Sequence, residues 1–149
     1  MRNSPNSANC RLKKNAAAST SRMARHISII QTTKGKLPRL PFRKIAEAVL
    51  PDGYTLEIVV IGDQKSRALN RTYRKKDLPT NVLSFPLSKH EGELFLNPRQ
   101  ARRDAPSFDM PYETFLCYLV IHGLLHLAGF RHGSKMSQAE TKLLQRFNT

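Results

Sequence analysis

The run from His122 to His132 constrains this chain more than any other segment, because it places three histidines at the spacing of metal ligands. Its sequence is HGLLHLAGFRH. On an α-helix, His122 and His126 lie on one face, one turn apart, and can reach the same ion. Gly129 can adopt the left-handed conformation that ends a helix, which would bring His132 to that ion from a third direction. The spacing therefore predicts a metal site with these three histidines as ligands.

The predicted ion is zinc, one per chain, because three neutral imidazoles suit it better than they suit magnesium or calcium. Three protein ligands leave one position of a tetrahedral zinc ion open, which is typical of catalytic sites. A water bound there can lose a proton near neutral pH and attack a substrate. The competing interpretation is three buried histidines, each satisfied by a backbone carbonyl. The ligand spacing and the intervening glycine favour the metal.

The same spacing occurs in metzincin proteases, which suggests a metallopeptidase as a second hypothesis. In those enzymes the residue after the first histidine is a glutamate that acts as general base. Here that position is Gly123, so the expected proton acceptor is missing while the ligands are intact. The peptidase hypothesis is therefore the weaker one.

Two further segments accompany the histidine run, LNRTYRKKDLPTNVLSFP at residues 69–86 and GELFL at residues 92–96. In this order, the three segments resemble the diagnostic blocks of the YbeY family of metal-dependent endoribonucleases, over about residues 26–149. The resemblance implies a zinc-dependent, single-strand-specific endoribonuclease. It also implies ribosomal RNA and the ribosome as partners, in rRNA maturation and ribosome quality control.

Two positions in the histidine run depart from the family pattern. Phe130 replaces the usual tyrosine, and Arg131 replaces the usual aspartate directly before the third histidine. An aspartate could orient a ligand histidine, whereas an arginine cannot accept a hydrogen bond. This departure supports a third hypothesis, a ribosome-associated binding protein with weakened catalysis.

A basic stripe is expected on the helix predicted over residues 63–72. Arg67, Arg71 and Arg74 follow a spacing of four and then three residues, so they line one face if the helix extends that far. Such a face can follow a phosphate backbone, but spacing alone favours an ordinary solvated surface. The resemblance implies a functional arginine at Arg74, which would neutralise the reacting phosphate. We therefore take Arg74 and the three histidines as the predicted catalytic residues.

The net charge of +14 is concentrated at the front of the chain. Residues 1–46 carry eleven Lys or Arg and no acid, whereas residues 47–149 carry a net charge of only +3. Residues 1–25 are rich in Ser, Asn, Ala and Arg, which predicts a disordered basic tail. This tail has three competing interpretations: an RNA-attracting arm, an organellar transit peptide, or sequence upstream of a true start at Met23.

Length and apolar content predict one soluble domain over residues 26–149. Cys10 and Cys117 have no pairing or ligand spacing, which favours a reducing compartment and hence the cytoplasm. The longest apolar stretch, residues 115–130, is too short to span a membrane and contains two histidines, so no membrane partner is expected. His90 has no spaced partner and is expected to be an ordinary surface histidine.

The hydrophobic pattern predicts an α+β fold with a small mixed four-stranded sheet and about five helices. The metal site is expected at the end of a central apolar helix that opens after Pro111. Asp63 and Ser137 are expected to cap helices, and Pro86 to end a strand. The predicted strands are residues 26–30, 56–61, 82–85 and 93–96, and the other predicted helices are residues 41–50, 63–72, 98–103 and 137–147.

Overall fold

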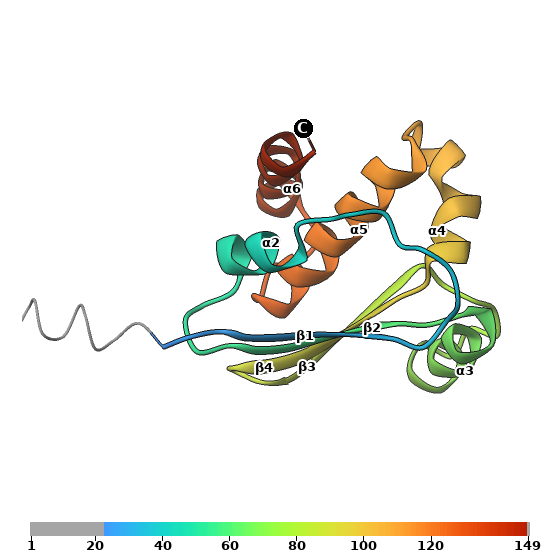
Figure 1. Cartoon of the computed structure of the whole chain (residues 1–149), viewed down its shortest axis with the longest axis horizontal. Helices are drawn as coiled ribbons and strands as arrows, with labels where there is room; N and C mark the ends of the chain where they lie inside the picture. Colours follow the sequence, from blue (N-terminus) through green and yellow to red (C-terminus); the bar gives the residue numbers. More distant parts are fainter. Residues whose placement is uncertain (1–22, 149) are drawn as a thin grey trace, which may run out of the picture.

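The computed structural model describes residues 23–148, and the predicted tail therefore lies almost wholly outside the described residues. A four-stranded mixed sheet is covered by helices, which confirms the α+β prediction (Figure 1). The elements are β1 (His26–Gln31), α2 (Phe42–Val49), β2 (Thr55–Val60), α3 (Asp63–Arg74), β3 (Val82–Ser88), β4 (Glu91–Leu96), α4 (Pro98–Asp104), the 3₁₀ helix η1 (Ala105–Phe108), α5 (Tyr112–Leu127) and α6 (Ser134–Phe147).

The strand order in the sheet is β1-β2-β4-β3. β2 pairs in parallel with both β1 and β4, whereas β3 pairs with β4 in antiparallel fashion. On β2, alternate residues Leu56, Ile58 and Val60 are fully buried, so one face of the sheet carries the core. The prediction that Pro86 ends a strand was wrong. Pro86 lies within β3, at an irregularity in the register between β3 and β4. An edge strand tolerates a proline because one of its sides needs no backbone donor.

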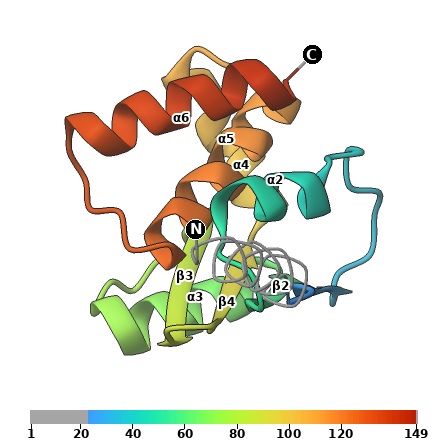
Figure 2. The ribbon, with the colours of Figure 1, turned by 90° about the vertical axis from the view of Figure 1, so that its left-hand side faces the viewer.

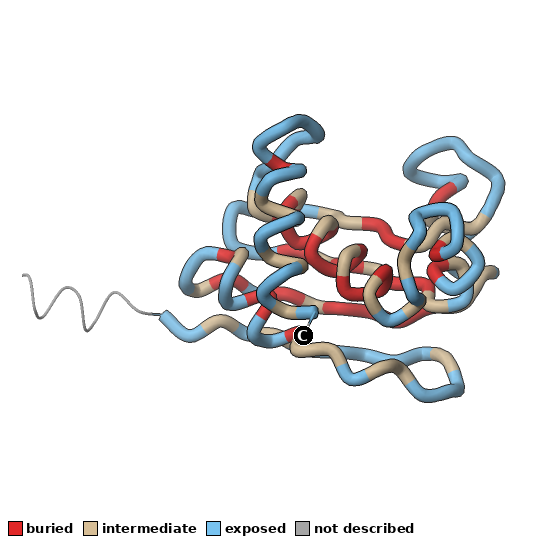
Figure 3. The backbone as a smooth tube through the Cα atoms, turned by 90° about the horizontal axis from the view of Figure 1, so that it is seen from above, coloured by how far each residue is buried: buried red, intermediate tan, exposed pale blue. Residues whose placement is uncertain are grey.

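α5 is the central helix of the layer above the sheet (Figures 1 and 3). Ten of its 16 residues are buried, as expected for a helix that is apolar around most of its circumference. α2, α4 and α6 lie on the same side of the sheet, whereas α3 lies on the other side (Figures 1 and 2). The Tyr73 ring of α3 packs on Phe85 of β3 with 4.9 Å between centroids. No helix within residues 23–148 is both long enough and apolar enough to cross a membrane.

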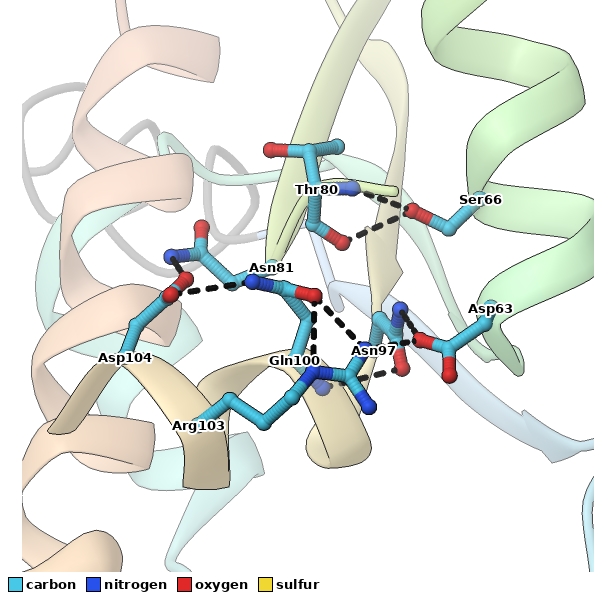
Figure 4. Close-up of polar contacts among 8 residues, drawn as sticks. All are labelled: Asp63, Ser66, Thr80, Asn81, Asn97, Gln100, Arg103 and Asp104. Carbon is cyan, nitrogen blue, oxygen red and sulfur yellow. Dashed lines mark hydrogen bonds and ion pairs between the residues drawn. The ribbon is translucent and has the colours of Figure 1, made fainter. Parts of the chain in front are cut away.

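Both predicted helix caps were wrong, because neither Asp63 nor Ser137 caps its helix with its side chain. α3 has Gly62 at its N-cap, and the Asp63 carboxylate instead accepts hydrogen bonds from Asn97 and Arg103 (Figure 4). α6 begins at Ser134, since the N–H of Ser137 already donates to the carbonyl of Gly133 at 3.0 Å.

Gly123 allows α5 to lie close against the sheet. A Cβ atom at this position would lie 2.2 Å from Leu94 Cδ1 and 3.0 Å from Ser84 Oγ. Ser84 Oγ donates a hydrogen bond to the Gly123 carbonyl at 3.0 Å, which joins β3 to α5. A glutamate at this position would therefore collide with the sheet, which is a physical argument against the metzincin-like mechanism.

Candidate active site

The structure brings the three predicted histidines together at the C-terminal end of α5. One ring nitrogen from each of His122, His126 and His132 lies within 4.8 Å of the others. His122 and His126 are half-buried on the last turns of α5, whereas His132 is exposed in the loop before α6. His90 lies elsewhere, exposed in the turn between β3 and β4, as predicted.

A Schellman motif ends α5 and turns the chain back toward the first two histidines. The N–H of Gly129 donates to the His126 carbonyl at 3.0 Å, and the N–H of Phe130 donates to the Leu125 carbonyl at 2.9 Å. Gly129 has a φ of +100°, which confirms the predicted positive-φ helix end. The reversal leaves the His132 ring 4.5 Å from that of His126, centroid to centroid.

Hydrogen bonds at Nδ1 hold two of the rings in place. His126 Nδ1 lies 3.1 Å from the Phe130 carbonyl oxygen, which can only accept, so Nδ1 carries the proton. His122 Nδ1 donates to Glu140 Oε2 at 2.6 Å. Burial, and then the neighbouring His122, lower the pKa of His126 and favour its neutral form. In the neutral form of both rings, each Nε2 therefore presents a lone pair.

The two Nε2 atoms lie 3.2 Å apart and face each other. Two lone pairs at this distance repel each other unless a cation lies near both. Tetrahedral zinc with Zn–N bonds of about 2.0–2.1 Å holds its ligand nitrogens about 3.3 Å apart. The observed spacing fits such an ion, so these three histidines could hold a metal.

Glu140 is a site residue whose role was not predicted from the sequence. An acid beside the third histidine is replaced by Arg131, but α6 supplies a carboxylate from a different direction. The Glu140 side chain is only 12% exposed and lies one turn after the buried Met136. The spacing of four residues between Met136 and Glu140 was the available signal, because it places the acid on the same helical face as an apolar residue. A carboxylate buried on such a face requires a partner.

The histidines open into a cleft with a volume of about 540 Å³, and Arg74 lines the same cleft. The other two arginines of the predicted stripe are engaged elsewhere. Arg67 makes two hydrogen bonds of 2.9 and 3.0 Å with Asp77, and Arg71 lies 3.8 Å from the same carboxylate. α3 extends to Arg74, so the predicted stripe exists. Arg67 and Arg71 pair with Asp77, whereas Arg74 lines the cleft.

A polar network holds the wall of the cleft formed by Thr80 and Asn81 (Figure 4). Ser66 Oγ donates to the Thr80 carbonyl at 2.7 Å and accepts from the Thr80 N–H at 2.8 Å. Asn81 Nδ2 donates to Asp104 Oδ2 at 2.9 Å. The loop between α3 and β3 is thus tied to both α3 and α4, so this wall is preorganised.

Comparison with known proteins identifies the family of the chain. Residues 22–148 match the family described as Endoribonuclease YbeY. The chain belongs to the YbeY family. An Endoribonuclease YbeY from Geobacter metallireducens is 34% identical over 122 residues, covering 72% of this chain and 79% of the relative. One from Geobacter sulfurreducens is 32% identical over 117 residues, covering 69% and 77% of the respective chains.

A solved structure shows the same fold as this YbeY-family chain. The solution structure of a Thermotoga maritima protein matches with a TM-score of 0.58 and 26% sequence identity. The match covers 80% of this chain and 87% of that protein. The match of residues 22–148 to the family confirms the resemblance inferred from the histidine run and the two upstream blocks.

Proposed function

We propose that this chain is a zinc-dependent endoribonuclease that cleaves single-stranded RNA in the maturation and quality control of ribosomal RNA. The observation that carries the proposal is the pair of Nε2 atoms 3.2 Å apart, in a cleft that Arg74 also lines. Membership of a family whose relatives are named endoribonucleases supplies the reaction class. Ribosomal RNA and the ribosome, in the cytoplasm, are the proposed partners and location.

Zinc is the proposed metal, held by His122, His126 and His132, because three imidazoles suit this borderline-soft ion. A bound zinc ion would polarise a phosphodiester and lower the pKa of a water molecule. Glu140 and the Phe130 carbonyl keep the protons of His122 and His126 on Nδ1, so each Nε2 points to the shared centre.

Arg74 is proposed to bind the phosphate that is cleaved. Its guanidinium is a cation that offers several N–H donors to phosphate oxygens. As negative charge builds up on those oxygens in the transition state, the interaction becomes stronger, which lowers the barrier. Thr80 and Asn81 line the same cleft and offer polar groups on a wall that is already held in place.

The deciding experiment measures metal content and RNA cleavage on the same purified sample. We expect about one zinc per chain by elemental analysis, cleavage of single-stranded RNA, loss of cleavage with a chelator, and recovery on adding zinc. Protein that carries no transition metal, and that gains neither activity nor melting temperature from zinc, would overturn the proposal. Casein serves as the control substrate and is expected to stay intact, because Gly123 provides no carboxylate.

A further inference from the structure

An exposed aromatic side chain stands at the rim of the cleft. Among the exposed large hydrophobic side chains of residues 23–148, only Phe108 lines this cleft, and 51% of it is exposed. It is the last residue of η1, between α4 and α5. About half of this side chain is therefore available for contact with a ligand in the cleft.

The Phe108 ring is supported from within the protein. It packs on Phe115, which is fully buried, with 4.7 Å between ring centroids and 31° between ring planes. Tyr118 stacks on Phe115 at 6.0 Å and lies 6.4 Å from Phe108. The exposed ring is therefore the outermost member of an aromatic cluster that is anchored in the core.

The backbone after Phe108 also holds the ring in place. Asp109 adopts the left-handed conformation with a φ of 57°, which is uncommon for a residue other than glycine, although aspartate tolerates it. The Asp109 N–H donates to the Pro106 carbonyl at 3.1 Å, and the Met110 N–H donates to the Ala105 carbonyl at 3.3 Å. This turn orders the backbone next to Phe108, so little backbone entropy would be lost when a ligand packs on the ring.

The aromatic cluster leads to the histidines. The Tyr118 ring lies 5.9 Å from the His122 ring, and both residues line the cleft together with Arg74. The cleft thus offers an exposed aromatic ring together with the histidines and a guanidinium. A nucleotide has the matching parts, a flat base and a charged phosphate.

We propose that Phe108 stacks on an unpaired base of RNA close to the phosphate that the site cleaves, and that this contact selects single-stranded over duplex RNA. A base in a duplex already stacks on its neighbours and offers no free face, whereas a base in a single strand can turn out onto an aromatic side chain. Phe108 is in this sense a positioning residue. The inference rests on the proposed endoribonuclease function.

The test compares Phe108→Leu with Phe108→Trp. Leucine keeps an apolar cover over Phe115 but has no aromatic face, and tryptophan restores such a face. For a short single-stranded RNA we expect Phe108→Leu to raise KM about tenfold, the effect of losing one base–aromatic stack, with little change in kcat. Phe108→Trp should bring KM back toward the wild-type value. Tyr73→Leu is the matched control, because Tyr73 is 64% exposed but does not line the cleft.

Abasic substitution of the RNA provides the second arm, which needs no protein variant. An RNA without the base next to the cut should raise the wild-type KM by the same factor, and Phe108→Leu should add no further increase. Equal KM values for wild type and Phe108→Leu on intact RNA, or an increase that tryptophan does not reverse, would overturn the inference while cleavage itself stands.

A third readout separates the inference from the proposed function. RNA that carries 2-aminopurine next to the cut should lose fluorescence on binding to wild type and to Phe108→Trp, but not to Phe108→Leu. If this quenching occurs in a protein that cleaves no RNA, the stacking contact is supported and the nuclease proposal fails. If RNA is cleaved without Phe108-dependent quenching, the nuclease proposal is supported and the stacking contact fails.

Discussion

Each half-buried histidine of the candidate site depends on one hydrogen-bond acceptor. His126 uses the carbonyl of Phe130, which the helix end itself supplies, whereas His122 uses the Glu140 carboxylate from another helix. The backbone acceptor cannot be removed by mutation, but the carboxylate can. Glu140 is therefore the residue through which the orientation of a ligand can be tested.

Glu140→Gln should weaken metal binding by about tenfold, within the range usual for partners of ligand histidines. The glutamine amide oxygen can still accept from His122 Nδ1, but it lacks the negative charge that makes the imidazole a better donor to a metal. A competition titration with a chromophoric chelator gives the affinity. Glu113→Gln, an exposed acid in the first turn of α5, is the matched control. Equal zinc affinities for all three proteins would show that Glu140 has no such role.

Arg74→Ala should slow RNA cleavage by a hundredfold or more, the order found when a group that stabilises transition-state charge is lost. Zinc content and melting temperature should stay near the wild-type values, because Arg74 is exposed. Arg67→Ala and Arg71→Ala should only weaken RNA binding, and less so at high salt, because both arginines contact Asp77 on the surface. Comparable, salt-sensitive defects in all three variants would show that Arg74 only contacts the phosphate backbone of the RNA, as the other two arginines do.

At the scale of elements, the predictable features are those that depend on residues near in sequence. The three histidines, the positive φ of Gly129 and the apolar α5 all follow from spacing within one segment. The predicted cap at Asp63 was wrong and the role of Glu140 was missed, because both side chains pair with residues distant in the sequence. Asp63, for example, meets Arg103 across the end of the sheet, which no local pattern indicates.

Gly123 and Gly129 should respond differently to substitution because different forces select glycine at each. Gly123→Ala forces a methyl group against Leu94 and Ser84 and should cost about 1–3 kcal/mol of folding stability. Gly129→Ala meets nothing within 4 Å but places a side chain at positive φ, and should cost about 1–2 kcal/mol.

Urea unfolding of the metal-free proteins measures both costs. Asparagine tolerates positive φ better than alanine, so Gly129→Asn should recover part of the loss at that position but Gly123→Asn should not. If asparagine rescues neither position, backbone strain at Gly129 is not the cause.

At the scale of the whole molecule, the charge and the core occupy different parts of the chain. Within residues 23–148, every buried core residue lies at or after Phe42, whereas eleven of the 25 basic residues lie in positions 1–46. Residues 47–149, which include every residue that lines the cleft, carry a net charge of only +3. The affinity of the cleft for RNA should therefore depend on its local groups more than on a general field.

Removing residues 1–22 deletes five basic residues and no acid. We expect the melting temperature and zinc content to stay unchanged, because the deleted residues are poor in apolar side chains that could join a core. RNA binding should weaken more at low salt than at high salt if these charges attract RNA, since fewer counterions are then released. A collapse in melting temperature would instead assign the segment a structural role.

If a metal binds at the proposed site, the pairing of His122 with Glu140 would link its occupancy to the local unfolding of α6. His132 precedes α6 and Glu140 lies within it, so detachment of α6 disturbs one ligand and the partner of another. Zinc should raise the free energy that is needed to detach α6. By linkage, this increase equals the binding free energy that zinc loses when α6 is detached. Hydrogen exchange should then show slower exchange of the α6 amides with zinc than without it, and no such difference in β1. Metal-free chains would release this helix more often, and a protease could distinguish them from loaded chains.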